Sequence, residues 1–280
     1  MSWRLRIKHI TGFTYAGTAH ASYNEARMTP LTLTGQNTLF SQVECSPAAA
    51  TWRYKDYWGT QVTVFDLQRP HQQLRVTATS LVETSPQAES AEQVGWDSLR
   101  HDAAIDLHAE LLVSTELTTV DAELVELARA TANGLAPFDA AMAIAEYVRD
   151  NVEYQPGSTG VRTSAQEAWS LRAGVCQDIA HLTVGLLRAI GIPARYISGY
   201  LYPKVDGAVG QTIAGQSHAW VEWWAGGWYG FDPTNGVPAG ARHVTVARGR
   251  DYGDVTPLKG VYHGAPSTGL GVTVEITRLA

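Results

Sequence analysis

The sequence predicts an α+β protein, with an antiparallel β domain first and a second domain in which a helix packs on an antiparallel sheet. Residues 3–84 carry alternating or β-branched runs that are separated by glycine and proline. Apolar residues then recur at helical spacing between residues 121 and 190. Two aromatic-rich runs joined by glycines within 217–234 predict a β-hairpin. We expect two domains, covering 1–90 and 91–280.

The first domain is predicted to contain five strands. They cover residues 3–10, 36–45, 51–57, 61–67 and 73–83. The polar and acidic segment 85–97 has little periodicity, which predicts a linker.

Helices dominate the first part of the second domain. Patterns at 121–132 and 137–152 place apolar residues on one face, and a shorter helix follows Ser164, an N-cap residue with Glu167 three residues on. A buried helix at 176–190 ends at a Gly-Ile-Pro stop.

Strands and the hairpin follow the buried helix. They are predicted at 194–202, 244–246 and 272–279, with a loop at 203–215. The sequence leaves open which sheet the last two strands join.

Composition excludes several classes of protein. The net charge of -6 and the absence of a Lys/Arg run argue against a nucleic-acid partner. No apolar run approaches the ~20 residues that span a membrane, so we expect no membrane partner. The two cysteines, Cys45 and Cys176, form no metal-type pair, which favours a reducing cytoplasm.

Cys176 lies at the predicted start of the buried helix. Unpaired backbone N–H groups and the positive end of the helix dipole favour a thiolate there. The same N–H groups can stabilise an oxyanion that forms when the thiolate attacks a carbonyl. The alternative for a lone cysteine is a small buried core residue.

The hairpin brings a histidine and an aspartate together only in one register. A three-residue loop at 225–227 pairs Trp224 with Trp228 and leaves His218 diagonal to Asp232 on the same face. Diagonal neighbours lie about 7–8 Å apart at Cα, within reach of a His–carboxylate hydrogen bond. A two-residue loop would separate them, so we predict the three-residue loop.

These three side chains suit nucleophilic catalysis. An imidazole takes the thiol proton, and a carboxylate on its other nitrogen orients the ring. Two alternatives remain: a structural His–Asp hydrogen bond, and a zinc site built from Cys176, His218 and Asp232.

Several runs resemble a known family. Residues 174–178, 187–196, 218–222 and 232–234 resemble the transglutaminase-like core of the papain-related superfamily, over about residues 140–235. Residues 23–28 are similar to the N-terminal domain of bacterial members.

The resemblance implies a cysteine enzyme that acts on peptide or protein amides through a thioester. It implies Cys176 as nucleophile, His218 as acid/base and Asp232 as the orienting residue. Water as acceptor makes a peptidase or amidase, which we rank ahead of a transglutaminase with an amine acceptor. The alternative is a catalytically silent peptide-binding module. We expect no cofactor and no metal, and family resemblance suggests an ATP-grasp-type ligase as partner.

Further site residues are predicted with less support from the pattern. The backbone N–H of Cys176 and the side chains of Tyr154 and Trp169 are candidate oxyanion donors, although aromatic residues before a core helix usually pack structurally. The candidate residues for a substrate groove are Trp220, Trp224 and Tyr252.

Overall fold

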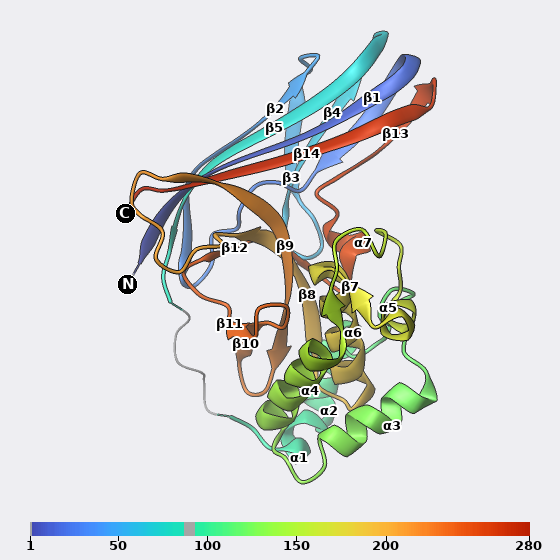
Figure 1. Cartoon of the computed structure of the whole chain (residues 1–280), viewed down its shortest axis with the longest axis vertical. Coiled ribbons are helices and arrows are strands. Elements are labelled where there is room, and N and C mark those ends of the chain that lie inside the picture. The colour runs from blue at the N-terminus through green and yellow to red at the C-terminus, as the bar shows by residue number, and fades with distance from the viewer. Residues whose placement is uncertain (1, 87–92) are drawn as a thin grey trace.

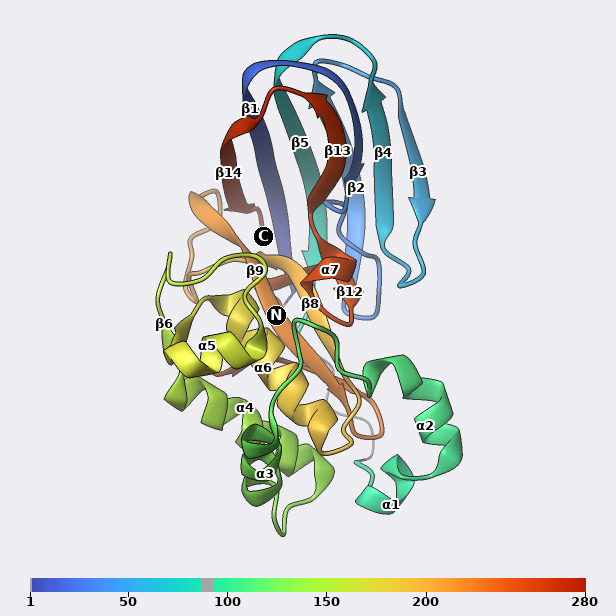
Figure 2. The ribbon, with the colours of Figure 1, turned by 90° about the vertical axis from the view of Figure 1, so that its right-hand side faces the viewer.

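The strands of residues 3–84 and 258–278 gather at one end of the molecule, and most of the helices lie at the other (Figure 1). This arrangement is seen in a computed structural model, which describes residues 2–86 and 93–280. A view turned by 90° shows β8 and β9 running from the strand-rich end into the helical end (Figure 2). The two chain ends lie side by side, and the Arg4 N–H donates to the carbonyl of Ala280 over 3.1 Å.

The strands fall into one large sheet and one short parallel pair, β6 with β7. Their bounds are β1 (Trp3–Ala26), β2 (Gln36–Ser46), β3 (Thr51–Lys55), β4 (Gln61–Leu67), β5 (His71–Thr84), β6 (Glu153–Tyr154), β7 (Ala173–Gly174), β8 (Ala194–Leu201), β9 (Thr212–Trp224), β10 (Trp228–Asp232), β11 (Val237–Pro238), β12 (His243–Gly249), β13 (Leu258–Gly264) and β14 (Ser267–Arg278).

The helices lie almost entirely between the N-terminal strands and β8. Their bounds are α1 (Trp96–Leu99), α2 (Asp102–His108), the 3-10 helix η1 (Ala109–Leu111), α3 (Ala122–Thr131), α4 (Pro137–Asn151), α5 (Ala165–Leu171), α6 (Cys176–Ala189) and α7 (Tyr252–Val255). In the part of the chain that the structure describes, none of them is both long and apolar enough to cross a bilayer.

β1 is the strand on which the N-terminal sheet is built. Leu5 and Ile7 point into the core while Arg4 and Arg6 stay exposed, as the alternation of a half-buried strand requires. It pairs with β5 and β14, and its far end pairs with β4 and β13. The predicted strand 3–10 was therefore too short, because partners on both sides keep the chain extended through Gly12.

The C-terminal strands return to the N-terminal sheet. β14 lies along β1, and its other edge pairs with the start of β9, where Val274 faces Gly215. This pairing ends the predicted loop 203–215 at Thr212. β13 and the short helices α1 and α2 were not predicted from the sequence. The proposed division near residue 90, like part of the linker 85–97, lies outside the described residues and stays a prediction.

The four predicted helices are confirmed, as are the Ser164 cap and the proline at the start of α4. The Asp121 carboxylate accepts the N–H of Leu124 at the start of α3, and Ser164 and Glu167 form a capping box at the start of α5. α4 begins with Pro137 at its first position. Each of these helices then turns its apolar face to α6.

α6 is the buried centre of the second core. Its residues from Asp178 to Arg188 are all buried, between α3, α4 and α5 on one side and β8 and β9 on the other. The Arg188 guanidinium is buried too, and it donates to the carbonyls of Ala194, Val113 and Arg250. A buried cation therefore ties two loops to the end of this helix.

Gly185 allows α6 to approach the loop before α3. A Cβ at this position would lie 2.3 Å from the carbonyl oxygen of Thr118. We predict that Gly185→Ala lowers the free energy of unfolding by about 1–3 kcal/mol, because the backbone must move. We expect this loss of stability even though alanine in a helix is about 1 kcal/mol more favourable than glycine. Urea denaturation measures the change.

Gly160→Ala is the matched control, since a Cβ there meets nothing within 4 Å. It should change stability by less than about 0.5 kcal/mol. A Gly185→Ala protein as stable as the wild type would contradict the tight contact.

Candidate active site

Cys176 is the first residue of α6, and its position is fixed by a buried cap. The Asp178 carboxylate is fully buried, and its Oδ2 accepts the N–H of Val175 over 2.8 Å. The Thr159 hydroxyl donates to the same oxygen over 2.6 Å. Because the N–H groups of a first helical turn have no partner within the helix, the backbone N–H of Cys176 is available to an anion at the thiol.

The hairpin has the predicted register. Trp224 pairs with Trp228 across a three-residue loop, and Gly226 in that loop has φ 100°. His218 Nε2 lies 2.7 Å from Asp232 Oδ2. The predicted diagonal contact between His218 and Asp232 is therefore present.

Asp232 is wholly buried and accepts five hydrogen bonds. Its Oδ1 accepts the N–H groups of Thr234 and Asn235, both over 3.1 Å. Its Oδ2 faces His218 at 2.7 Å, the Asn235 amide at 2.7 Å and His243 Nε2 at 3.1 Å. These donors replace the water that an ionised carboxylate would otherwise bind.

The electrostatics of the site favour an ionised Asp232 and a protonated His218. Burial alone would raise the pKa of the Asp232 carboxyl, but hydrogen bonds from His218 and His243 hold it well below its usual range. Burial opposes charge on His218 too. Hydrogen bonds to Asp232 and Cys176, and the negative charges of those groups, outweigh it and raise the pKa of His218 to about 10.

Cys176 is close enough to His218 to contribute to the raised pKa of the ring. Because Nε2 faces Asp232, Nδ1 is the ring nitrogen that remains for the thiol. His218 thus lies between a buried carboxylate and the Cys176 side chain, which is the order of groups that nucleophilic catalysis by a cysteine needs.

His218, Asp232 and His243 also have the composition of a metal site, with ligand atoms within 4.8 Å of one another. The hydrogen bonding of His243 argues against that use. Its Nδ1 accepts the N–H of Gly240 over 3.2 Å, so the neutral ring carries its proton on Nε2. A protonated nitrogen donates to Asp232 and cannot bind a metal.

A pocket of about 450 Å³ opens at the Cys176 sulfur and reaches the N-terminal sheet. It is lined by Tyr154, Pro156, Val161, Val175, Cys176, Gln177, Tyr196, Ser198, Gly215, Gln216, Ser217, His218, Ala219, Tyr252, Pro257, Val272 and Val274. Both β14 and α7 therefore contribute walls to the pocket.

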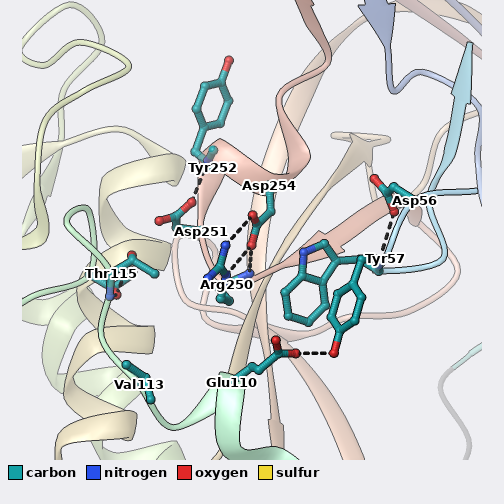
Figure 3. Close-up of polar contacts among 12 residues, drawn as sticks. Asp56, Tyr57, Glu110, Val113, Thr115, Arg250, Asp251, Tyr252 and Asp254 are labelled. Atoms are coloured by element: carbon teal, nitrogen blue, oxygen red, sulfur yellow. Dashed lines mark hydrogen bonds and ion pairs between the residues drawn. The ribbon is translucent and has the colours of Figure 1, made fainter. Parts of the chain in front are cut away.

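The rim formed by α7 is held from two sides. The N–H of Tyr252 donates to Nε2 of His181, a buried imidazole whose pKa burial lowers to about 3. Arg250 forms an ion pair with Asp254 beside Tyr252 (Figure 3).

The same view shows the hydroxyl of Tyr57, from the N-terminal domain, donating to Glu110 over 2.6 Å.

The candidate oxyanion donors lie in different places. Tyr154 is half exposed and lines the pocket. Trp169 is buried away from the pocket, 6.1 Å from the Tyr147 ring, and the Arg172 guanidinium lies 3.2 Å from its centre. Trp169 therefore packs structurally, which was the alternative to a role as oxyanion donor.

Of the three aromatic residues predicted to line a groove, Tyr252 lines the pocket. Trp220 does not line the pocket: it is buried, and its ring contacts His243 at 5.2 Å. Trp224 packs on His108 at 4.7 Å near the helical end. These two tryptophans thus pack against buried histidines of the core and leave the pocket to other residues.

His243 and Asn235 contact the site but were not predicted from the sequence. Asn235 follows Asp232 by three residues, in the turn after a strand. This position is the sequence signal from which its contact with Asp232 could have been predicted. His243 directly precedes the strand predicted at 244–246, but its register against β8 depends on contacts that the sequence does not encode locally.

Comparisons with protein families match both parts of the chain. Residues 125–233 match the transglutaminase-like superfamily, a range that contains Cys176, His218 and Asp232. Residues 5–83 match the bacterial transglutaminase-like N-terminal region.

Individual relatives agree with these matches. An uncharacterized protein of Mycobacterium leprae is 47% identical over 99% of this chain and 100% of its own. A protein-glutamine gamma-glutamyltransferase of Pseudomonas aeruginosa is 36% identical over 29% of this chain and 13% of its own. The solved structure of a candidate cysteine protease from Cytophaga hutchinsonii has a TM-score of 0.74 at 26% identity, and the match covers 98% of this chain and 92% of that one.

The raised pKa of His218 predicts a pH-dependent stability. An unfolded imidazole titrates near pH 6.5, whereas His218 titrates near 10 when the protein is folded. The stabilisation is therefore full below pH 6.5 and is lost as the pH rises through about 10.

Urea unfolding of Cys176→Ala and Cys176→Ala/His218→Gln tests this pH dependence without a titrating thiol. In Cys176→Ala, Asp232 still raises the pKa of the imidazole. The free-energy difference between the two proteins should shrink as the pH rises above 6.5, and the loss should be complete at a lower pH than in the wild type, because the contribution of Cys176 to the raised pKa is absent. A difference that is independent of pH would contradict a protonated His218.

Proposed function

Because the chain belongs to the transglutaminase-like superfamily, we propose that it is a cysteine enzyme that transfers acyl groups from peptide-like amides. The observation that carries the proposal is that Cys176 and His218 line one pocket, while the buried Asp232 holds His218 from behind. Family members with a cysteine-protease or transglutaminase description support cysteine-based catalysis.

In the first step the Cys176 thiolate attacks the carbonyl carbon of the amide. The imidazolium of His218 gives its Nδ1 proton to the leaving amine as the carbon–nitrogen bond breaks, and a thioester remains. Asp232 holds the His218 ring in place and stabilises its charge. In the second step neutral His218 takes a proton from water or an amine, which attacks the thioester and releases Cys176.

The negative oxygen of the intermediate needs donors close to the sulfur. We assign one to the backbone N–H of Cys176, the first residue of α6. We assign the second to the hydroxyl of Tyr154, because this residue lines the same pocket. The buried position of Trp169 supports a packing role for it instead.

The pocket supports an uncharged acyl donor. Among the described residues that line it, none is Asp, Glu, Lys or Arg, and the polar ones are amides, hydroxyls and the Cys176–His218 pair. Valine and proline side chains form the rest of the wall. A neutral peptide segment or a carboxamide side chain suits these surroundings, since a charged group would lose hydration without a partner.

The acceptor separates two forms of the reaction. We rank hydrolysis ahead of amine transfer, because water is always present and its exclusion needs a dedicated amine site. The silent peptide-binding module is the second function, and it is disfavoured because Cys176, His218 and Asp232 are all retained. A cytoplasmic location, suggested by the two free cysteines, and an ATP-grasp-type ligase partner are further proposals.

We predict that Cys176→Ala lowers turnover of amide substrates at least about 10³-fold, because no nucleophile remains, while the fold is retained. Mass spectrometry of a panel of neutral peptide amides, with and without a primary amine, measures turnover and identifies the acceptor. Cys45→Ala is the control and should keep wild-type activity. Retained turnover in Cys176→Ala would overturn the mechanism.

Labelling of the thiol tests the pairing without a known substrate. Iodoacetamide should label Cys176 rapidly well below the unperturbed thiol pKa of ~8.5, with Cys45 as the internal comparison. In His218→Ala the onset of labelling should move to higher pH, because the imidazolium that stabilises the thiolate is gone. An unchanged pH dependence would show that the pairing is wrong.

A further inference from the structure

Asp232 has a second imidazole partner that the proposed mechanism does not use. His243 begins β12, a strand that pairs with β8 and comes from a different part of the chain than the hairpin. It is 6% exposed, and its Nε2 lies 3.1 Å from the carboxylate oxygen that binds His218. One oxygen of Asp232 is thus shared by two histidines.

The hydrogen bonds of His243 determine which nitrogen carries its proton. The backbone N–H of Gly240 can only donate, so Nδ1 of His243 accepts and Nε2 is the protonated nitrogen. Burial lowers the pKa of His243, against the opposing effect of Asp232, so the ring is neutral. The charged and titratable groups that act on it are Asp232, His218 and Arg242.

The surroundings hold the His243 ring in this orientation. Trp220 packs edge to face on it, with ring centres 5.2 Å apart. The Trp220 ring also stacks on His218, at 6.2 Å between centres and 29° between planes. A single indole therefore fixes both imidazoles relative to the carboxylate between them.

We propose that His243 is a positioning residue, a neutral donor that fixes the Asp232 carboxylate so that His218 is held as an imidazolium facing Cys176. The inference rests on the proposed acyl-transfer function and extends it from three residues to four. A carboxylate oxygen with fewer donors could rotate toward a poorer angle with His218. The imidazolium would then be less stable, and less of the thiol would be ionised at neutral pH.

The experiment compares His243→Leu with His243→Gln in the full-length protein. Leucine removes both nitrogens, whereas the glutamine amide can place a donor near the position of Nε2. His243→Leu should lower kcat about tenfold to a hundredfold, with KM little changed, because a hydrogen bond to a charged group is lost. The pH midpoint of iodoacetamide labelling at Cys176 should rise by about one unit, and His243→Gln should restore most of both.

His71→Leu is the matched control, because His71 is also 6% exposed but lies in the N-terminal sheet. It should lower thermal stability and leave the labelling profile unchanged. If His243→Leu does not fold, His243→Asn replaces it, since the shorter amide reaches only the position of Nδ1.

The outcomes separate this inference from the proposed function. A wild-type protein with rapid labelling at neutral pH, together with an unchanged midpoint and kcat in a folded His243→Leu, would overturn the role of His243 alone. An ordinary thiol profile in the wild type would overturn the proposed function and this inference with it. A shifted midpoint that glutamine restores would support the positioning role.

Discussion

A carboxylate that is excluded from water needs a hydrogen bond for nearly every lone pair, and Asp232 meets this requirement with donors from three parts of the chain. The hairpin supplies His218, the turn after β10 supplies Asn235 and two backbone N–H groups, and β12 supplies His243. Each donor can reach the carboxylate only if its own element lies in register. The geometry at the thiol therefore depends on satisfying one buried charge.

The same principle operates at the other end of α6. The Arg188 guanidinium is buried and binds carbonyl groups in the loop at Val113 and at Arg250, next to the rim of the pocket. The N-terminal end of the helix carries Cys176 and the buried Asp178 cap. α6 thus positions the thiol at its first residue and the α7 rim through Arg188 at its other end. The length of this helix therefore sets the distance between the thiol and the rim.

Local patterns in the sequence predicted the elements whose partners are close in the chain. The start of α6 followed from its apolar spacing, and loop length alone determined the register that joins His218 to Asp232. The long course of β1, the strand β13 and the contact of His243 depend on pairing between distant segments, for which the sequence carries no local signal. Trp220 and Trp224 were assigned to a groove because aromatic composition does not reveal which neighbouring elements cover a side chain.

The return of β14 to β1 has a consequence for how the protein is made. Leu5 pairs with Arg278, so β1 leaves the ribosome long before β14, and this edge of β1 stays uncovered until β14 has been made. The pairing closes a very long loop, which makes this step slow compared with the formation of α3 to α6. Until then the nascent chain exposes an open β edge that can pair with other chains. We expect newly synthesised molecules, rather than finished ones, to be the population that needs chaperones.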